Sequence, residues 1–419
     1  MTGLIVVVAA VTIIWVIALL FAISDGRIAR RQKRLATAVD DSMKSDSIRF
    51  SVVIPAHEQL EALQLHLPSF LEQDYGCFEV IVVDMASTDG TRDYLEQMEM
   101  LHPNLRHTAV PATARDISLD RLALTLGIRA ARYEWVVMTQ ASCEPLSSQW
   151  LFGMSKAIRS RKETTDIVLG QVQYAAKAHS WTDYKEDYHR LWHTIATANH
   201  VMSGHAAVRA DGCNVAIRRD AFMAGGGFVS GQTLRIGAAD LLVNNLSTPT
   251  NTALAVCHEA VMTEERPDDR LWRQMRQSYA AIRSMQRHTT LYRIVQNLRM
   301  AQPWMVLLFV VLPLAVSIAV LSDGVRNSWL FDEMENFDVQ YGSSYSYYVL
   351  IALAVYLGLL MLSYYITRIV NFNRSSKALG IHTFYSSLII FDFLFPFWQL
   401  STVVGYWFTP RSTYRKKFV

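Results

Sequence analysis

The N-terminal segment of this chain is the feature that most restricts how it can fold. The segment runs from Leu4 to Ile23 without a charged residue. About 20 apolar residues is the length at which a helix crosses a hydrocarbon core of about 30 Å. Two more runs of this kind extend from Trp304 to Leu321 and from Tyr347 to Thr367. The sequence therefore predicts three spanning helices in a multi-pass membrane protein.

The charges beside these runs predict their orientation. Basic residues are absent before the first run and follow it closely, at Arg27, Arg30, Arg31, Lys33 and Arg34. This order is the reverse of a cleavable signal peptide. Residues 322–346 are instead rich in Asp and Glu. Because Lys and Arg accumulate on the cytoplasmic side, we expect residues 27–303 in the cytosol, and the N-terminus and the acidic loop on the outer side of the membrane.

The last apolar stretch, from Thr383 to Phe408, has two interpretations. Asp392 and Pro396 lie near its middle, and a basic tail follows it. A single crossing would leave that tail outside, which favours a broken helix that re-enters the inner leaflet or lies at its surface. A fourth spanning helix is the alternative. Residues 1–26, 27–48, 49–290 and 291–419 are the expected membrane helix, basic linker, main domain and C-terminal membrane region.

The amino-acid composition restricts the classes of molecule that this chain is expected to bind. The chain has 51% hydrophobic and 18% charged residues and a net charge of only +3. Its basic residues flank apolar segments, so an anionic membrane surface is a better partner than nucleic acid. The four cysteines lie far apart with no CxxC pair, which argues against a zinc knuckle or a disulfide framework and predicts reduced thiols in a cytosolic domain.

The segment between the membrane runs alternates strand and helix patterns. Short β-branched runs at Phe50–Pro55, Phe78–Asp84 and Trp135–Thr139 are typical of buried parallel strands. Helical spacing of apolar residues separates them, at 58–73, 91–100 and 119–131. A doubly wound α/β sheet follows from this order. Ligands bind at the carboxyl ends of such strands, where the turns IPAHE, VVDMASTDGT and MTQASCEP lie.

Six blocks in this order resemble the family 2 glycosyltransferases of bacterial membranes. The three turns resemble the nucleotide-sugar half, and DGCNVAIRRDAF, RIGAADLLVNN and TEERPDDRLWRQMRQ resemble the acceptor half. The likeness covers roughly residues 50–290. It implies a GT-A (Rossmann-like) domain beside transmembrane helices, a nucleotide-diphosphate sugar as donor, and a lipid-linked or glycan acceptor of polysaccharide or glycolipid biosynthesis.

The resemblance assigns the donor-binding residues to the strand ends. It implies that Glu58 and Asp84 accept hydrogen bonds from base and ribose, that Asp89 braces the turn, and that Arg121 contacts phosphate. Pro55 and His57 belong to the same site. Asp84 and Asp89 are equally suited to cap the STDGT turn, and Arg121 to a solvated helix face.

The acidic motifs of the family are incomplete here. Mg²⁺ or Mn²⁺ is expected for the family, held by two aspartates after the third strand, but the matching residues are Gln140 and Ser142. Glu144 is a weak substitute, so the sequence assigns no metal ligand. The family's catalytic base lies in an acidic segment, and in this chain Ala238 and Ala239 replace two of its acidic residues, so that only Asp240 remains. Asp240 is either the base or a helix cap.

The last of the six blocks, TEERPDDRLWRQMRQ, matches the family pattern more completely than the acidic motifs do. Trp272, Arg273, Gln274 and Arg276 resemble the family's cluster at the diphosphate and acceptor. Arg binds phosphate with two hydrogen bonds and replaces part of a metal's charge. An amphipathic interfacial helix is the alternative.

Two functions remain open from the sequence. One is sugar transfer at the inner face of the membrane. The other is a catalytically inactive scaffold or regulator that binds nucleotide sugar, lipid or a partner membrane enzyme. The spacing of His189 and His193 also suits zinc, but without a following Glu it favours ordinary helix histidines. A transporter is disfavoured because the three spans lack ionisable residues.

Overall fold

The computed structural model describes residues 2–38, 48–111, 118–160, 164–175, 180–228, 237–287, 289–311 and 343–408. The chain divides into two compact units. The first, here called the helical unit, comprises Met1–Arg27, Arg293–Arg374 and Thr383–Pro396. The second, the sheet unit, comprises Ile28–Tyr292, Ser375–His382 and Phe397–Val419. Four of the divisions between the units fall inside helices, after Arg27, Tyr292, Arg374 and Pro396.

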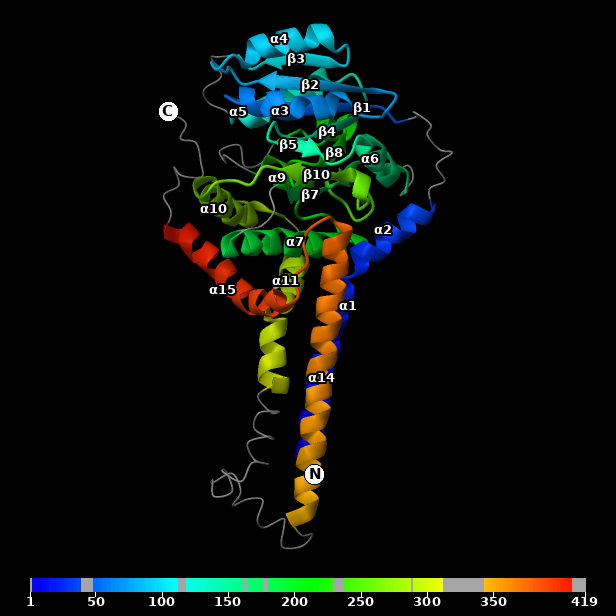
Figure 1. Cartoon of the computed structure of the whole chain (residues 1–419), viewed down its shortest axis with the longest axis vertical. Helices are drawn as coiled ribbons and strands as arrows, with labels where there is room; N and C mark the ends of the chain where they lie inside the picture. The colour runs from blue at the N-terminus through cyan, green and yellow to red at the C-terminus, as the bar shows by residue number, and fades with distance from the viewer. Residues whose placement is uncertain are drawn as a thin grey trace. The chain divides into compact units, whose positions relative to one another are not determined.

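A mixed seven-stranded sheet forms the centre of the sheet unit (Figure 1), in the order β3-β2-β1-β4-β8-β6-β9. Its strands are β1 (Phe50–Ala56), β2 (Phe78–Asp84), β3 (Leu105–Ala109), β4 (Trp135–Met138), β6 (Ile167–Leu169), β8 (Val215–Arg218) and β9 (Thr252–Leu254). The first four run parallel, which confirms the predicted α/β fold. The strand β8 is antiparallel to β4 and β6, so the sheet is mixed.

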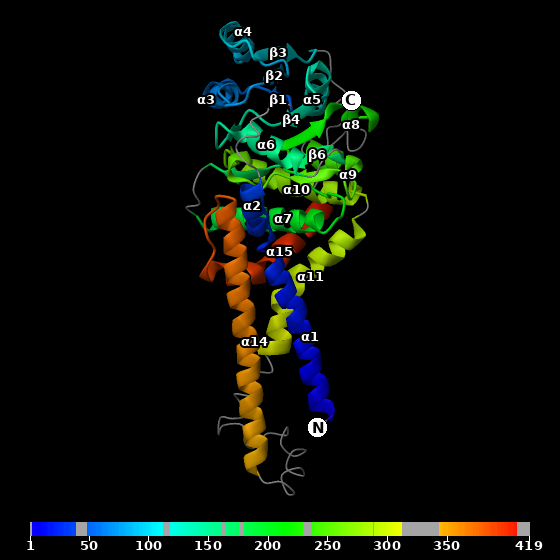
Figure 2. The same cartoon turned by 90° about the vertical axis from the view of Figure 1, so that its right-hand side faces the viewer.

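Helices cover both faces of the parallel strands, as the alternating sequence pattern predicts. Figure 2 shows α3 (Leu60–Leu71) and α5 (Leu119–Ala130) on opposite sides of β1, with α4 (Thr91–Leu101) on the side of α3. Gly127 lets α5 approach β1 closely, because a Cβ there would lie 2.3 Å from Val53 Cγ1. The buried apolar faces of α3 and α4 and the strands form one continuous core.

A second, three-stranded sheet has the order β5-β10-β7 (Cys143–Pro145, Val261–Glu264 and Gln171–Tyr174). Around the two sheets lie α6 (Trp150–Arg159), α7 (Trp181–Met202), α8 (Arg219–Ala224), α9 (Ala238–Leu246), the 3₁₀ turn η3 (His258–Ala260) and α10 (Asp269–Met285). The sheet unit also includes α2 (Arg27–Ala38) from Ile28 onward.

Asn214 joins the two sheets. Its amide nitrogen donates to the carbonyls of Gln171 and Ala260, both at 2.9 Å, and its oxygen accepts from Trp150 Nε1 at 3.1 Å. Gly170 leaves the space for this side chain, since a Cβ there would lie 2.2 Å from Asn214 Cγ. The fully buried amide therefore fixes the turn before β8 against the second sheet.

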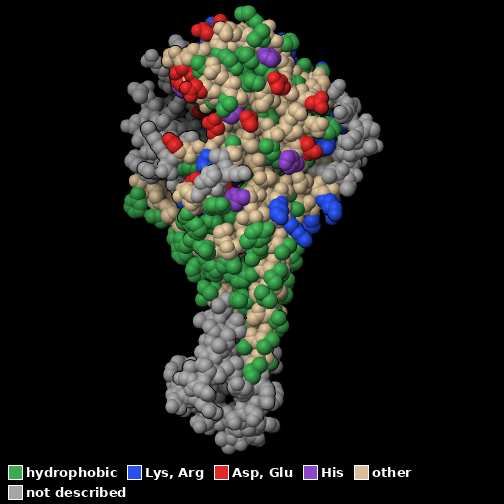
Figure 3. Space-filling model, viewed as in Figure 1, with side chains coloured by type: hydrophobic (Ala, Val, Ile, Leu, Met, Phe, Trp, Pro, Cys, Tyr) green, Lys and Arg blue, Asp and Glu red, His purple; other side chains and the backbone are tan. Residues whose placement is uncertain are grey.

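The helical unit contains α1 (Thr2–Ser24), α11 (Thr290–Val306), a π-helical turn at Leu307–Val311, α14 (Ser343–Ala378) and the part of α15 (Ser386–Phe408) up to Pro396. Among the described residues, Val8–Arg34, Ile351–Ala378 and Ser386–Phe408 are long and apolar enough to cross a membrane. Large hydrophobic side chains are exposed along α1 and α14, and Figure 3 shows hydrophobic side chains over much of the described surface of this unit. Of the predicted run 304–321, the part after residue 311 lies outside the described residues.

Four buried charged side chains connect the helices of this unit. Arg368 pairs with Asp392 at 2.7 Å and also with Asp25, which pairs in turn with Arg299. All four side chains are at most 4% exposed. The quartet is neutral overall. Asp25, Arg299 and Arg368 lie just beyond the three predicted spans, which themselves carry no charge, whereas Asp392 lies within the last apolar stretch. A buried charge needs such pairing because its desolvation is costly.

Replacing Asn214 with alanine should destabilise the sheet unit more than the loss of an ordinary hydrogen bond. The change leaves three buried polar groups without their partner, and each such group costs about 1–3 kcal/mol. We therefore expect the free energy of unfolding to fall by more than about 2 kcal/mol. Urea unfolding, followed by tryptophan fluorescence, measures this change. Asn104→Ala, which removes one hydrogen bond to the Leu71 carbonyl, is the matched control, expected at about 0.5–1.5 kcal/mol. Equal losses in the two variants would contradict the role of Asn214.

Candidate functional site

A cavity of about 450 Å³ opens in the sheet unit at the carboxyl ends of the parallel strands. Pro55 of β1, Met85 after β2, and Thr139 and Gln140 after β4 contribute to its wall. The opposite wall comes from α7, from the turn before β8, and from α9 and β10. The cavity therefore lies where the strand order predicts a ligand site.

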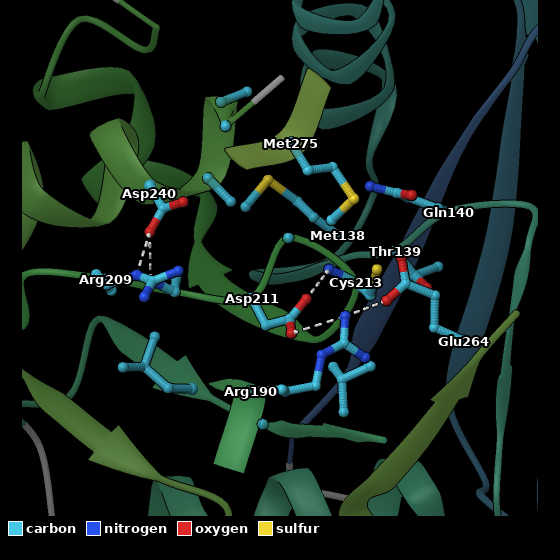
Figure 4. Close-up of a pocket in the computed structure, with 18 of the residues that line it drawn as sticks. Met138, Thr139, Gln140, Arg190, Arg209, Asp211, Cys213, Asp240, Glu264 and Met275 are labelled. Carbon is cyan, nitrogen blue, oxygen red and sulfur yellow. Dashed lines mark hydrogen bonds and ion pairs between the residues drawn. The ribbon is translucent and has the colours of Figure 1, made fainter. Parts of the chain in front are cut away.

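The charged centre of the cavity is a group of three side chains (Figure 4). Arg190 of α7 forms an ion pair with Glu264 of β10 and lies 3.6 Å from Asp211. Its guanidinium also stacks 3.9 Å from the ring centre of Tyr174. Burial raises the pKa of Glu264, although the attraction of Arg190 opposes this effect. One cation thus neutralises much of the negative charge in this part of the cavity.

A second charged pair lies on another part of the wall. Asp240 stands in the first turn of α9, which begins after Gly237 with a φ of +92°. Its Oδ1 accepts a hydrogen bond of 3.2 Å from the Ala210 backbone and lies 3.7 Å from Arg209 Nε. Burial raises the pKa of Asp240, and Arg209 opposes the rise. A buried carboxylate with a raised pKa, facing a cavity, is typical of a general base.

Two further residues of the predicted site line the cavity. Arg121 is buried in α5, and burial lowers the pKa of its guanidinium to about 10 while Asp120 opposes this change. Trp272 is buried at the start of α10 and packs edge-on against Tyr174, with ring centres 5.8 Å apart. Both side chains are therefore located where a ligand in the cavity would contact them.

The residues predicted to hold the nucleoside form a network between two turns. Glu58, with φ of +50°, accepts hydrogen bonds from the backbone and hydroxyl of Thr88 at 2.7 and 3.1 Å. Asp84 accepts from the Ser87 backbone at 3.1 Å. Asp89 accepts from Thr91 and the Leu60 backbone; burial would raise its pKa, but these hydrogen bonds hold it below the usual value. His57 is exposed, with Nδ1 3.1 Å from the Met85 carbonyl.

Comparison with known proteins identifies this domain. Residues 51–226 match the model of glycosyl transferase family 2. Residues 51–226 therefore form a domain of the family 2 glycosyltransferase type. Its mixed α/β sheet is that of the GT-A fold, as the motifs predicted.

Individual relatives cover different shares of the chain, at low sequence identity or over a short segment. A putative teichuronic acid biosynthesis glycosyltransferase, TuaG of Bacillus subtilis, is 34% identical over 76 residues, which are 17% of this chain and 30% of TuaG. Among solved structures, a mannosyltransferase from Pyrobaculum calidifontis in complex with GDP-Man and Mn²⁺ is 19% identical, with a TM-score of 0.48 over 87% of this chain and 98% of the other. Residues 1–349 of TarS from S. aureus are 12% identical, with a TM-score of 0.40 over 80% and 93%.

The glycosyltransferase domain does not present the hard oxygen ligands that Mg²⁺ or Mn²⁺ prefers at the expected turn. Gln140 lines the cavity, whereas Ser142 is not part of its wall. Glu144 does not point to a metal ligand, because its carboxylate already binds His66 Nδ1 at 2.9 Å. The other ring nitrogen of His66 binds Glu265 at 3.1 Å. The described residues at this turn therefore do not fit a Mg²⁺ or Mn²⁺ site.

Other predicted residues of the glycosyltransferase domain have different outcomes. The side chains of Arg273, Gln274 and Arg276 lie outside the described residues, although the backbone of α10 is described. His189 and His193 line the cavity, and both contact the Gln399 amide, at 3.0 and 3.2 Å. This amide contact fits the interpretation of the pair as ordinary helix histidines.

Arg190, Arg209, Asp211 and Glu264 are the residues of this site that sequence reasoning missed. Asp211 and Glu264 stand in two of the recognised blocks, DGCN and TEERP, so the blocks located them without giving a role. Arg190 lies in a helix rich in aromatic residues, where no motif distinguishes it. Only the packing of α7 against the second sheet brings these side chains together.

Replacing Arg190 with methionine should destabilise the glycosyltransferase domain strongly. The change leaves Glu264 and Asp211 without their cation, and breaking a buried pair costs about 3–5 kcal/mol. The loss should be smaller at acidic pH, where Glu264, whose pKa is raised, takes up a proton. Urea unfolding at neutral and acidic pH measures both effects.

Arg92→Met is the control for Arg190→Met. It removes an exposed pair with Glu96, at i and i+4 of α4, which contributes about 0.3–0.5 kcal/mol. A loss of this size in Arg190→Met would contradict the inference that Arg190 stabilises the buried carboxylates.

Proposed function

We propose that this protein is a membrane-attached glycosyltransferase that transfers a sugar from a nucleotide-diphosphate donor to a lipid-linked or polysaccharide acceptor. The observation that carries the proposal is the cavity of about 450 Å³ at the strand ends of the family 2 domain. Its volume suits a sugar-sized ligand. Its wall combines residues of both halves of the domain, which is the arrangement that a donor and an acceptor require.

The nucleotide would bind at the strand-end turns beside the cavity, since Glu58, Asp84 and Asp89 are not part of the cavity wall. Asp84 and Glu58, at the ends of β2 and β1, would supply carboxylates for base and ribose, and Asp89 would hold their turn. Arg121 would contact the diphosphate from α5. A guanidinium remains charged even with its pKa lowered to about 10, so it can offset phosphate charge at neutral pH.

Asp240 would serve as the base that deprotonates the acceptor hydroxyl. It faces the cavity, and its raised pKa brings it closer to the operating pH, as efficient proton transfer requires. Arg209 and the Ala210 backbone would hold its carboxylate in position. In an inverting transfer the hydroxyl proton moves to Asp240 as the acceptor oxygen bonds to the sugar and the nucleoside diphosphate leaves.

The proposed location is the inner face of a bacterial cytoplasmic membrane, with the glycosyltransferase domain in the cytosol and α1 and α14 spanning. The cytosolic orientation of the domain is inferred from the basic residues that follow α1 and those in the last turns of α14. For α15 we propose an interfacial position. The segment after Pro396 supports it, because Gln399 contacts His189 and His193, and Tyr406 packs beside Leu241 and Ile282 within the sheet unit.

A catalytically inactive relative is the second candidate, favoured by Gln140, Ser142, Ala238 and Ala239 in place of the family's acidic residues. Such a protein would bind nucleotide sugar, lipid or a partner membrane enzyme as a scaffold. Loss of a metal removes several kcal/mol of charge stabilisation from the transition state. Arg121 and the arginines of α10 would have to supply that stabilisation in an active enzyme.

Transfer or hydrolysis of nucleotide sugars by the purified full chain distinguishes these candidates. We expect turnover, with Asp240→Asn lowering kcat by about 10²–10⁴-fold because the base is lost, and with Asp93→Asn, an exposed control on α4, unchanged. Arg209→Gln should move the acidic limb of the pH profile to higher pH, since Arg209 holds down the pKa of Asp240. A wild-type chain that binds a nucleotide without any turnover would favour the scaffold.

Nucleotide binding should depend little on Mg²⁺ or Mn²⁺. Calorimetry with uridine and guanosine diphosphates is expected to detect at least one of them, equally well with chelator. Asp84→Ala should weaken binding of the diphosphate and the nucleoside alike. Arg121→Gln should weaken the diphosphate alone, by about 1.5–3 kcal/mol, compared with Arg129→Gln, an exposed control on the same helix.

Replacing Gln140 and Ser142 together with Asp should create metal dependence of this binding, because carboxylates supply the missing hard ligands. Full transfer should not increase in that variant, since Ala238 and Ala239 are unchanged. Abolition of wild-type nucleotide binding by chelator would contradict the expected metal independence.

A further inference from the structure

Beside the cavity lies a group of side chains with the chemistry of a different metal. We propose that Cys143, Cys213 and Glu264 bind a zinc-like divalent cation, with the fourth coordination position open to the cavity. One ligand atom of each side chain lies within 4.8 Å of the others. Atoms this close can converge on one tetrahedral ion after small side-chain rotations, because Zn–S bonds are about 2.3 Å and Zn–O bonds about 2.0–2.2 Å.

The backbone holds these ligands on three separate segments. Cys143 and Glu264 are directly paired across β5 and β10. Cys213 lies in the turn before β8, and its neighbour Asn214 fixes this turn to the second sheet. Both thiols are almost fully buried, at 0% and 2% exposure. The site is therefore built by the fold and does not depend on a mobile loop.

Access to the site comes from the cavity. Cys213 and Glu264 are part of the cavity wall, and Figure 4 shows Cys213 beside Glu264 and Arg190. Three protein ligands with one side open to a cavity is the pattern of catalytic zinc sites, whereas structural sites have four protein ligands. A water molecule or a substrate oxygen would complete the coordination.

The ligand types determine which cation is bound. Thiolate sulfur prefers zinc and softer ions, whereas Mg²⁺ and Mn²⁺ prefer oxygen. The site begins one residue after Ser142, which stands where the family's hard-ion ligands are expected. The same turn that does not fit Mg²⁺ therefore presents a sulfur ligand one residue later.

Charge balance supports binding despite burial. One carboxylate oxygen of Glu264 pairs with Arg190, and the carboxylate also accepts a hydrogen bond from the Cys213 thiol, whose proton would leave when the ion binds. Binding of a divalent cation M²⁺ by two thiols releases two protons, according to M²⁺ + 2 RSH → M(SR)₂ + 2 H⁺. The two added positive charges replace the two that leave, so the net charge of the buried cluster does not change. No electron transfer is involved.

Titration of the reduced, chelator-treated full chain with Co²⁺ tests the proposal without any nucleotide. We expect one Co²⁺ per chain with a sulfur-to-cobalt charge-transfer absorption, lost on addition of Zn²⁺. Cys143→Ser and Cys213→Ser should each weaken the absorption and lower the affinity by more than about 10-fold, because even changes outside the ligand shell cost about 10–100-fold. The double variant should lack the absorption. Cys257→Ser, which removes a buried thiol bonded to the Gly153 carbonyl elsewhere in the domain, should bind Co²⁺ like the wild type.

Two results would overturn the proposal. One is the absence of the charge-transfer band in a reduced protein whose Trp fluorescence shows the native fold. The other is a band of wild-type strength in both Cys143→Ser and Cys213→Ser. Release of two protons per Zn²⁺, measured in weakly buffered solution, would support the stoichiometry, and Glu264→Gln should weaken binding without abolishing the band. Because no step requires nucleotide or turnover, the outcome is separate from that of the glycosyltransferase assay.

Discussion

The arrangement of the cavity depends on the buried amide of Asn214. Its three hydrogen bonds connect the turn before β8 to the carbonyls of Gln171 and Ala260 and to the indole of Trp150. A backbone carbonyl buried away from water needs a partner, so the amide stabilises the junction of the two sheets while fixing its own turn. Asp211 and Cys213, which precede it, reach the cavity wall because this junction holds the turn in place.

Opposing charges are distributed in pairs around the cavity. Arg190 neutralises Glu264 and Asp211, and Arg209 neutralises Asp240. In a buried environment each unpaired charge would cost several kcal/mol, so the arginines permit a concentration of carboxylates that the domain could not otherwise bury. The same pairing gives the carboxylates different proton affinities, since burial raises the pKa of Asp240 and Glu264 while the arginines oppose the rise. The interior thereby combines fixed positive charge with a carboxylate of raised pKa.

In the helical unit, the charges serve a different physical purpose. Asp25 in the turn after α1 and Arg299, Arg368 and Asp392 on three further helices form a neutral buried quartet. Apolar contacts between membrane helices are weakly directional, because lipid tails are as apolar as the helix surfaces. Paired charges require one rotation and one depth of each helix. The quartet therefore specifies how α1, α11, α14 and the first half of α15 align with one another.

The sequence by itself determined the local elements and the type of domain. Phe50–Ala56 and Phe78–Asp84 agree with the predicted strands within one residue, since continuous β-branched runs bounded by turn residues have one favourable conformation. The six ordered blocks gave the glycosyltransferase family, and the runs at Leu4 and Tyr347 gave helices of membrane length.

What the sequence could not determine depends on side chains far apart in the chain. Three features are of this kind: the antiparallel direction of β8, the pairing of Arg190 with Glu264, and the convergence of Cys143 with Cys213. Each joins segments about 70 residues apart or more. No local spacing encodes such contacts, because they arise only when the strands and helices pack and each buried polar group must find a partner.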